Sequence, residues 1–478
     1  MFELNILFQP VGGYCRRNVA TCRVDEPLVA AAAQMSRQGI SSLVVCEDGR
    51  PVGIITDRDL RNKVVALGLN PASLTVAVVM TSPLITITEG EFLFEALHRI
   101  SRHGIHRIVV TDAACNLIGI ITDSDILHLQ SNSPQRLVRR IEEAQTVADL
   151  KELHQQVQEL VTHLIGTGVP IKELVRLIAH LNDQILIRLI TLLRSGQFSD
   201  LTERFAFLVL GSEGRGEQTL TTDQDNALVY ADDLTPSELQ RVVAFSEELI
   251  RSVIEIGIPP CPGGIMANNE VWRMPLSGWK KVLDGWFSLP TPENILKVGM
   301  VADLRALTGD RLLEQELRQH ITGRLKKNEV YLGYMLNNLL RFRVPLGWFG
   351  RIQTEKGTYK GQLDLKKAAI FSITEGVKIL ALFEGVQVGG TEERLNWLME
   401  DKVVDQRDGN DLLAVFHTLV FFRLKSQVEA LREGRVPDNR IAHDRLNGIE
   451  QARLQVALEQ VRSFQESLKL KFRLGQLI

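Results

Sequence analysis

Residues in the middle of the chain have the types and spacing of a phosphate-binding metal site. An apolar run from Phe205 leads into Gly211-Ser212, and a second apolar run follows Asp223-Gln-Asp225. Strand side chains alternate, so the two acids project from one face at the same edge. Glycines let the backbone approach a phosphate, and two carboxylates beside a triphosphate supply the oxygen ligands that Mg²⁺ or Mn²⁺ requires. The spacing therefore predicts metal-assisted chemistry on a triphosphate.

The segment from Leu210 to Asn226, with its Gly-Ser and Asp-x-Asp patterns, resembles the polymerase-β-like nucleotidyltransferase superfamily. More narrowly, it is similar to the nucleotidyltransferases related to the N-terminal region of protein-PII uridylyltransferase. The resemblance implies that Ser212 and the Gly211 backbone hold the β- and γ-phosphates. It implies that Asp223 and Asp225 carry the metals that align an acceptor hydroxyl. The acceptor is expected to be a regulatory protein or a small molecule.

Two further residues complete the site that this resemblance implies. Arg215 either contacts phosphate or pairs with Glu217 or Asp223 as scaffolding. The superfamily usually adds a third carboxylate from a later strand, and Asp303 is the candidate because it follows an apolar run that we predict to be extended. The alternative is that Asp303 pairs with Arg305 or caps the following helix.

The N-terminal region contains an internal repeat. Gly53-Ile-Ile-Thr56-Asp-Arg-Asp59 returns as Gly119-Ile-Ile-Thr122-Asp-Ser-Asp125, with a period of about 65 residues. Each copy shows a helical stretch, an apolar β-branched strand, a turn, a second strand and a helix start. Neither copy is long enough to bury a comfortable core alone. We therefore expect two small α/β units packed around a shared cleft.

The repeat resembles a pair of CBS domains over about Val11 to Gln130. In that family the Gly-x-x-Thr-x-x-Asp pattern binds an adenine nucleotide, with the Asp on the ribose hydroxyls and the Thr near the phosphate. The resemblance implies these roles for Thr56 with Asp59, for Thr122 with Asp125, or for both pairs, and it suggests a homodimer through the CBS pair. The alternative is that each Thr and Asp only caps the helix that follows.

Helical regions flank the central segment. From Pro134 to Leu193, apolar residues recur at helical spacing, which predicts two or three amphipathic helices that serve as a spacer or transmit a signal. Beyond Asn328 the same periodicity predicts a helical bundle, which resembles the substrate-binding domain that follows this nucleotidyltransferase in its family. Three basic residues are candidate acceptor contacts, unless they lie on a solvated helix face: Lys366, Lys367 and Arg394.

Composition excludes several classes of function. Lys plus Arg total 55 against 58 for Asp plus Glu, so the chain has no general attraction to nucleic acid or to an anionic membrane. We find no signal peptide, and no stretch approaches the roughly 20 apolar residues of a membrane span. We therefore expect a cytoplasmic protein that binds neither nucleic acid nor membrane. The scattered cysteines predict neither a disulfide framework nor a zinc cluster.

These observations predict an α/β and α chain in four parts. They are a tandem CBS pair (1–133), a helical connector (134–198), a polymerase-β-like nucleotidyltransferase core (199–327) and a C-terminal helical bundle (328–478). The leading hypothesis is a signalling nucleotidyltransferase regulated by an adenine nucleotide. The alternative is a non-catalytic nucleotide sensor that binds partners through its helices. Retention of Ser212, Asp223 and Asp225 favours the enzyme, because a sensor would not need both metal carboxylates.

Overall fold

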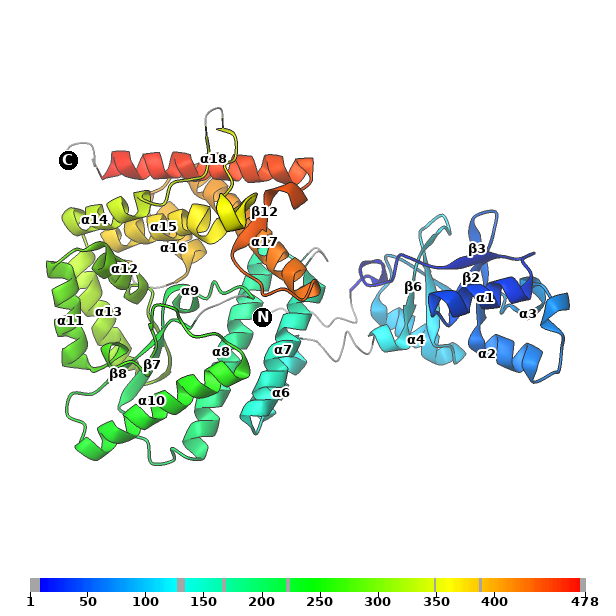
Figure 1. The fold of residues 1–478 in the computed structure, drawn as a ribbon, viewed down its shortest axis with the longest axis horizontal. Coiled ribbons are helices and arrows are strands. Elements are labelled where there is room, and N and C mark those ends of the chain that lie inside the picture. The colour runs from blue at the N-terminus through cyan, green and yellow to red at the C-terminus, as the bar shows by residue number, and fades with distance from the viewer. Residues whose placement is uncertain are drawn as a thin grey trace. The chain divides into compact units, whose positions relative to one another are not determined.

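The computed structural model describes residues 9–126, 134–165, 169–220, 224–347, 350–386 and 389–472 (Figure 1). The chain divides into two compact units, Met1–Arg136 and Leu137–Ile478. The regions predicted as connector, nucleotidyltransferase core and helical bundle lie together in the second unit. None of the helices in the described ranges has both the length and the apolar character that a membrane span needs.

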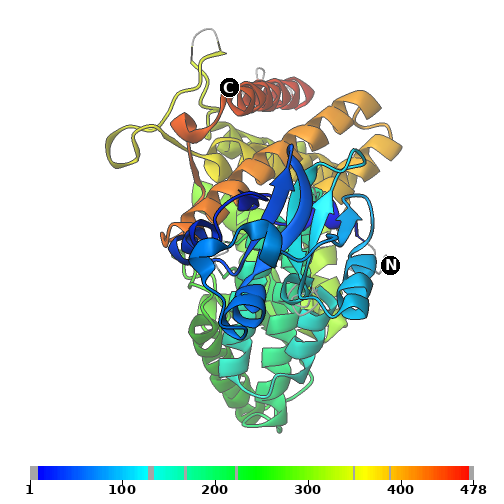
Figure 2. The ribbon, with the colours of Figure 1, turned by 90° about the vertical axis from the view of Figure 1, so that its right-hand side faces the viewer.

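The first unit contains two copies of one small α/β motif, as the repeat predicts. The first copy comprises β1 (Thr21–Arg23), α1 (Leu28–Gln38), β2 (Ser42–Glu47), β3 (Arg50–Thr56), α2 (Asp57–Leu60) and α3 (Val76–Val79). The second comprises β4 (Thr86–Thr88), α4 (Leu93–His103), β5 (Arg107–Thr111) and β6 (Leu117–Thr122). Each copy forms a three-stranded sheet with one parallel and one antiparallel pair. The two sheets lie side by side (Figures 1 and 2).

Matching positions build the cores of the two copies. Leu28, Leu43 and Ile55 are buried in the first copy, and Leu93 and Ile121 are buried in the second. Helices α1 and α4 both end at a glycine in the left-handed conformation, which is the common way to stop a helix before a strand. The repeated sequence therefore gives the same local structure twice.

A four-stranded sheet organises the second unit. Its strands are β7 (Phe205–Val209), β8 (Asn226–Tyr230), β9 (Arg273–Pro275) and β10 (Arg305–Gly309), in the order β10-β7-β8-β9. The central strand β7 is antiparallel to both of its neighbours, and β8 is parallel to β9. Every residue of β7 is buried, so both faces of the sheet are covered.

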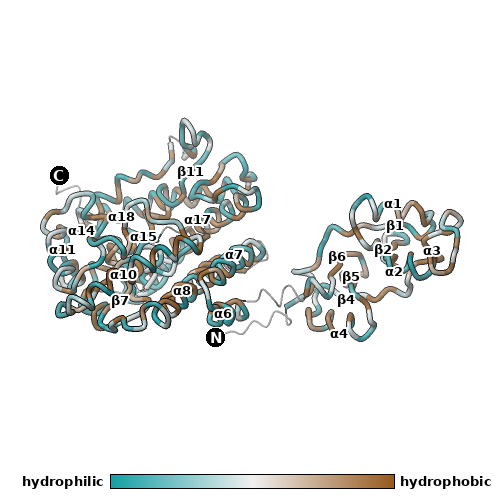
Figure 3. The backbone as a smooth tube through the Cα atoms, turned by 60° about the horizontal axis from the view of Figure 1, so that its bottom comes forward, coloured by the Kyte–Doolittle hydropathy of each residue, from teal (hydrophilic) through white to brown (hydrophobic). Residues whose placement is uncertain are grey.

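Alternation along β7 assigns its side chains to two different layers. Phe205 and Phe207 join the apolar cluster formed with α7 (Val147–Leu164), α8 (Ile171–Ser195) and α10 (Pro236–Ile256). Figure 3 shows hydrophobic residues along α8. Many of them are buried against the sheet and the neighbouring helices. Ala206 and Leu208 join the other cluster. Its sheet-side helices are α11 (Leu276–Ser288), α12 (Pro292–Val301) and α13 (Arg311–Leu325).

The C-terminal helices extend this second layer. They are α14 (Glu329–Leu340), α15 (Phe371–Glu384), α16 (Thr391–Glu400), α17 (Gln406–Arg432) and α18 (Gly448–Lys471). A short hairpin pairs β11 (Gln362–Asp364) with β12 (Arg440–Ala442). Helix α15 is buried on nearly all sides, as expected for a helix at the centre of a bundle. Two further α-helices are α6 (Pro134–Glu143) and the single turn α9 (Gly211–Gly214). The predicted fold class is confirmed.

Candidate active site

The Gly-Ser turn lies against one of the predicted metal-binding acids. Strand β7 leads into Gly211 and Ser212, which open α9. The Leu210 N–H donates to the Asp225 carbonyl oxygen at 2.8 Å, extending the pairing of β7 with β8. Gly211 has a φ of +51°, and a Cβ there would lie 3.3 Å from Asp225 Oδ2. The turn and this carboxylate therefore meet at one sheet edge; Asp223 lies outside the described residues.

A cavity of about 240 Å³ opens between this edge and the C-terminal helices. We call it the catalytic cavity. The predicted catalytic and phosphate-binding residues within the described ranges line it, namely Gly211, Ser212, Arg215, Asp225 and Asp303. The helices contribute charged and polar side chains from the opposite side, among them Lys366, Thr374, Glu375, Lys378 and Arg423. Residues far apart in the sequence thus converge on one space.

Asp303 is fully buried among three cations. Its Oδ2 lies 2.7 Å from Lys378 Nζ and 2.5 Å from Arg215 Nη1, and its Oδ1 lies 2.6 Å from Arg394 Nη1. Burial alone would raise the pKa of Asp303, but the cations, led by Lys378, hold that pKa well below its ordinary value. Because both oxygens are taken, the geometry favours a scaffolding role for Asp303 over a metal-binding one.

The local structure before Asp303 differs from the predicted extended run. Pro292–Val301 form helix α12, capped by Thr291 and started by a proline at its first turn. Ile295, Val298 and Val301 are buried at helical spacing. Apolar residues three apart favour a helix over a strand, so the run before Asp303 is helical. Asp303 itself lies in the turn between α12 and β10.

Arg215 connects the Gly-Ser turn to the helical bundle. Its Nε donates to Glu217 Oε2 at 2.7 Å, in addition to its bond to Asp303. The other oxygen of Glu217 accepts from the Thr391 N–H at the start of α16. Of the predicted alternatives, pairing with Glu217 is present. The segment after the turn is therefore attached to α16 by a continuous chain of charged contacts.

Two helical residues of this network, Lys378 and Arg394, are buried. Lys378 is buried and donates to the Gly299 carbonyl oxygen at 2.8 Å and to Glu375 Oε1 at 2.6 Å, besides Asp303. Lys378 is not among the predicted site residues, although a lysine inside an apolar helix needs buried partners and is a usable signal. Arg394 is also buried, so the prediction that it contacts an acceptor is wrong.

A buried acid that the sequence analysis missed lies beneath the turn. The Glu213 side chain accepts a hydrogen bond from Gln218 Nε2 at 3.0 Å. Burial, and then the charge of Asp225, raise the pKa of Glu213 to about 8. The carboxyl is thus mostly protonated at neutral pH, which avoids a buried negative charge beside the partly exposed Asp225.

Thr56 and Asp59 form a capping box in the first copy of the repeat. The Asp59 N–H donates to Thr56 Oγ1, and Asp59 Oδ2 accepts from the Thr56 N–H at 3.0 Å. Asp59 Oδ1 also accepts from Lys63 Nζ and from Thr81 Oγ1, both at 2.9 Å. A cavity of about 730 Å³ lies beside them, reaching from Ser41 to His106. The predicted capping role is present, and it leaves room for a ligand.

Thr122 and Asp125 repeat this geometry with a different cation. The Asp125 N–H donates to Thr122 Oγ1 at 3.0 Å, and Asp125 Oδ2 accepts from the Thr122 N–H at 3.0 Å. Here Asp125 Oδ1 pairs with Arg16 Nη2 at 2.6 Å, and Arg16 lies far away in the sequence. The two predicted ligand sites are therefore alike in their caps and unlike in their charge partners.

Family models match most of the chain. The CBS domain model matches residues 11–66 and 76–132. The model described as "Putative nucleotidyltransferase DUF294" matches residues 155–293, and the one described as "Putative nucleotidyltransferase substrate binding domain" matches residues 329–472. The chain therefore combines a CBS-domain pair with the two DUF294 family domains. Of the catalytic cavity, Gly211, Ser212 and Asp225 lie in the nucleotidyltransferase match, and Lys378 and Arg423 lie in the substrate-binding match.

Individual relatives match about a quarter of this chain. An uncharacterised protein of Methanopyrus kandleri is 40% identical over 121 residues, which are 25% of this chain and 62% of that protein. Hypoxic response protein 1 of Mycobacterium tuberculosis is 31% identical over 118 residues, 24% of this chain and 82% of its own length. A solved structure of an uncharacterised conserved protein from Pyrococcus horikoshii is 28% identical, covers 26% of this chain and 93% of that one, and has a TM-score of 0.25.

Proposed function

We propose that the chain transfers a nucleotidyl group from a nucleoside triphosphate to a hydroxyl-bearing acceptor in the catalytic cavity. The observation that carries this proposal is the convergence of the Gly-Ser turn and Asp225 with Lys366 and Arg423 on one space. The turn presents backbone and a hydroxyl for phosphate oxygens, and the two cations offset the charge of a triphosphate. In this role the acceptor oxygen bonds to the α-phosphorus while the α–β phosphoanhydride bond breaks and pyrophosphate leaves.

We place the metal at Asp225 together with Asp223. The described residues contain no group of three His, Cys, Asp or Glu arranged as a metal site. Metals that accompany triphosphates use one or two carboxylates and complete their shell with phosphate oxygens and water, so this donor set fits Mg²⁺ or Mn²⁺. A bound metal would neutralise charge on the transferred phosphoryl group. Asp303 and Arg215 position the turn from beneath.

The nature of the transfer is inferred from family resemblance. Similarity to the protein-PII uridylyltransferase family favours a uridylyl group and a regulatory protein as acceptor, and a small-molecule acceptor is the alternative. Lys366 lines the catalytic cavity. The side chain of Lys367, the next residue along the chain, is exposed. These two lysines remain our candidates for acceptor contacts. The free cysteines, five in number, fit a reducing cytoplasmic setting.

For the CBS pair we propose regulation by an adenine nucleotide. The cavity beside Thr56 and Asp59 is large enough for a nucleotide, and its wall includes Arg58, Lys63 and Arg107 as cations for phosphate. We also propose a homodimer through this unit, supported by exposed apolar side chains such as Val65 and Leu67. Calorimetry with AMP, ADP and ATP on the full chain tests ligand binding, and analytical ultracentrifugation tests the dimer.

The decisive experiment for catalysis uses each labelled nucleoside triphosphate with Mg²⁺ and a host lysate as the source of acceptor. We expect label transfer by the parent protein and a loss of at least about a hundredfold in Asp225→Ala, because a metal carboxylate acts directly on the transferred group. Asp411→Ala, on the exposed surface of α17, is the matched control. Equal transfer by Asp225→Ala and the parent would refute the metal role. No transfer with any nucleotide would favour the non-catalytic sensor.

A further inference from the structure

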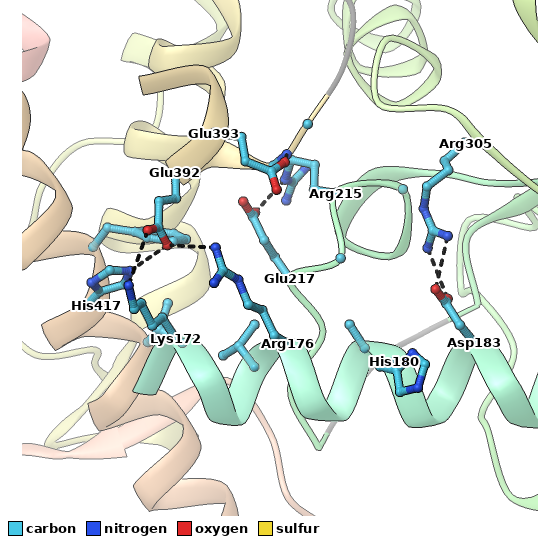
Figure 4. A pocket seen from close by; sticks show the side chains of 18 of the residues that line it. Lys172, Arg176, His180, Asp183, Arg215, Glu217, Arg305, Glu392, Glu393 and His417 are labelled. Carbon is cyan, nitrogen blue, oxygen red and sulfur yellow. Dashed lines mark hydrogen bonds and ion pairs between the residues drawn. The ribbon is translucent and has the colours of Figure 1, made fainter. Parts of the chain in front are cut away.

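A second cavity of about 540 Å³ is lined in part by Arg215 and Glu217 (Figure 4). We call it the α8 cavity, because α8 forms one long wall. The segment following the Gly-Ser turn forms another wall, and the start of α16 and the middle of α17 complete it. Arg215, Glu217, Phe416 and Val420 line both cavities. The two spaces therefore share a partition within the same unit.

Three side chains with N–H donors gather around one carboxylate at the end of the α8 cavity. Glu392, in the first turn of α16, lies 3.8 Å from Lys172 Nζ, 3.9 Å from Arg176 Nη2 and 3.5 Å from His417 Nε2. Figure 4 shows them pointing toward one another from α8, α16 and α17. All these distances exceed those of good hydrogen bonds. Arg176 also lies 3.6 Å from Glu173 on its own helix.

This cluster has more donors than acceptors. A lysine ammonium carries three N–H groups and a guanidinium five, against the oxygens of two carboxylates held at a distance. Within the described residues, the side chains of Lys172 and Arg176 make no hydrogen bond at all. Other cations of the cavity are differently placed, since Arg305 pairs with Asp183 at 3.0 Å and Arg215 is bound to Glu217. The spare donors are concentrated at one end.

One side of the α8 cavity is apolar enough to hold an organic group, although paired charged residues such as Arg305 and Asp183 line its other end. Ile171, Val175 and Ala179 line it from α8, and Phe416 and Val420 line it from α17. A pocket of this size that combines an apolar wall with polar groups is typical of small-molecule sites. The donors at one end of the cavity fit an anionic group on a ligand, and the apolar wall fits the organic part of that ligand.

We propose that the α8 cavity binds a phosphorylated small molecule, with its phosphate on Lys172, Arg176 and His417. A phosphate dianion competes with Glu392 for these donors because it carries about twice the charge and accepts in three directions. The organic part lies along Val175 and Phe416. This ligand is distinct from the triphosphate of the catalytic cavity.

Such a ligand is placed to regulate the proposed transfer, a consequence that rests on the proposed function. Glu392 follows Thr391, whose N–H is held by Glu217, and Glu217 holds Arg215 at the partition. At the other end of the cavity, Arg305 bridges Asp183 of α8 to the Glu213 carbonyl oxygen, both at 3.0 Å. Displacing Glu392 therefore acts on both α16 and the segment after the Gly-Ser turn. Binding can shift activity only by its differential affinity for the two arrangements.

Pyridoxal 5′-phosphate tests the site directly, because its phosphate occupies an anion site while its aldehyde condenses with a nearby lysine amine and releases water. Borohydride then reduces the imine, and peptide mass spectrometry locates the label on the full chain. We expect labelling of Lys172 to saturate with reagent concentration and to be competed by inorganic phosphate. Lys151, exposed on α7, should label slowly and without saturation.

Variants separate a binding site from a merely reactive lysine. Arg176→Ala and His417→Ala should each raise the half-saturating concentration about tenfold, the usual effect of losing a charge-assisted hydrogen bond. Arg462→Ala, exposed on α18, should leave it unchanged. Linear labelling of Lys172, or unchanged saturation in both variants, would overturn the proposal. Asp225→Ala should lose transfer yet label Lys172 as the parent does, so failure of the proposed function and failure of this site give different results.

Discussion

The two units hold their acidic residues in opposite ways. In the CBS pair, Asp59 and Asp125 bond to a threonine three positions earlier, and their side chains are 12% and 20% exposed. In the second unit, Asp303 has no exposed side-chain surface and bonds to cations from positions 215, 378 and 394. The CBS acids thus depend on a local motif that solvent reaches. Asp303 depends on contacts from distant parts of the chain, so substituting Asp303 should lower the free energy of unfolding far more.

The largest effect should come from Asp303→Asn. The substitution leaves three buried cations without their shared carboxylate, and breaking a buried ion pair costs about 3–5 kcal/mol. Tryptophan fluorescence during urea unfolding measures it cleanly, since all five tryptophans lie between 272 and 397, in the second unit. Asp411→Asn, an exposed change on α17, is the control. If the two variants unfolded at the same urea concentration, the network would not stabilise the unit.

The next effect is a pH dependence caused by Glu213. Its folded pKa is about 8 against an ordinary 4.5, so between these values the folded state binds more protons than the unfolded state. The free energy of unfolding should therefore fall as pH rises through this window, by up to about 1.4 kcal/mol per pH unit. Glu213→Gln keeps the acceptor for Gln218 and should flatten this slope. A slope equal to that of the parent would show that another group titrates.

Gly214→Ala should cost about 1–3 kcal/mol through steric overlap. A Cβ at this position would lie 1.9 Å from the Asp303 carbonyl oxygen, so the turn or the Asp303 backbone must shift. Gly323→Ala is the matched control, because it lies in α13 with no heavy atom within 4 Å of the added carbon. That control should be neutral or stabilising by up to about 1 kcal/mol, since alanine favours a helix. Equal losses in both variants would contradict the close approach.

These contrasts explain how much of the molecule the sequence could predict. Apolar periodicity and glycine placement are local, so the repeat, helix α1 and the Gly-Ser turn beside Asp225 could be predicted. The partners of Asp303 could not, because pairing with Lys378 and Arg394 depends on how α15 and α16 pack on the sheet. The α8 cavity could not be predicted from the sequence for the same reason. Its donors, Lys172 and His417, meet only after the helices assemble.

The smallest effect, and the sharpest test of local control, is loss of the threonine caps. Thr56→Ala and Thr122→Ala each remove the oxygen that accepts the Asp59 or Asp125 N–H, at a cost of about 1 kcal/mol. Hydrogen exchange at these two amides should accelerate about fivefold in each variant. The charge partners Lys63 and Arg16 differ, but exposed ion pairs contribute little, so the two accelerations should agree. A much smaller acceleration in the second copy would mean that Arg16, reaching across the repeat, holds Asp125 in place without its threonine.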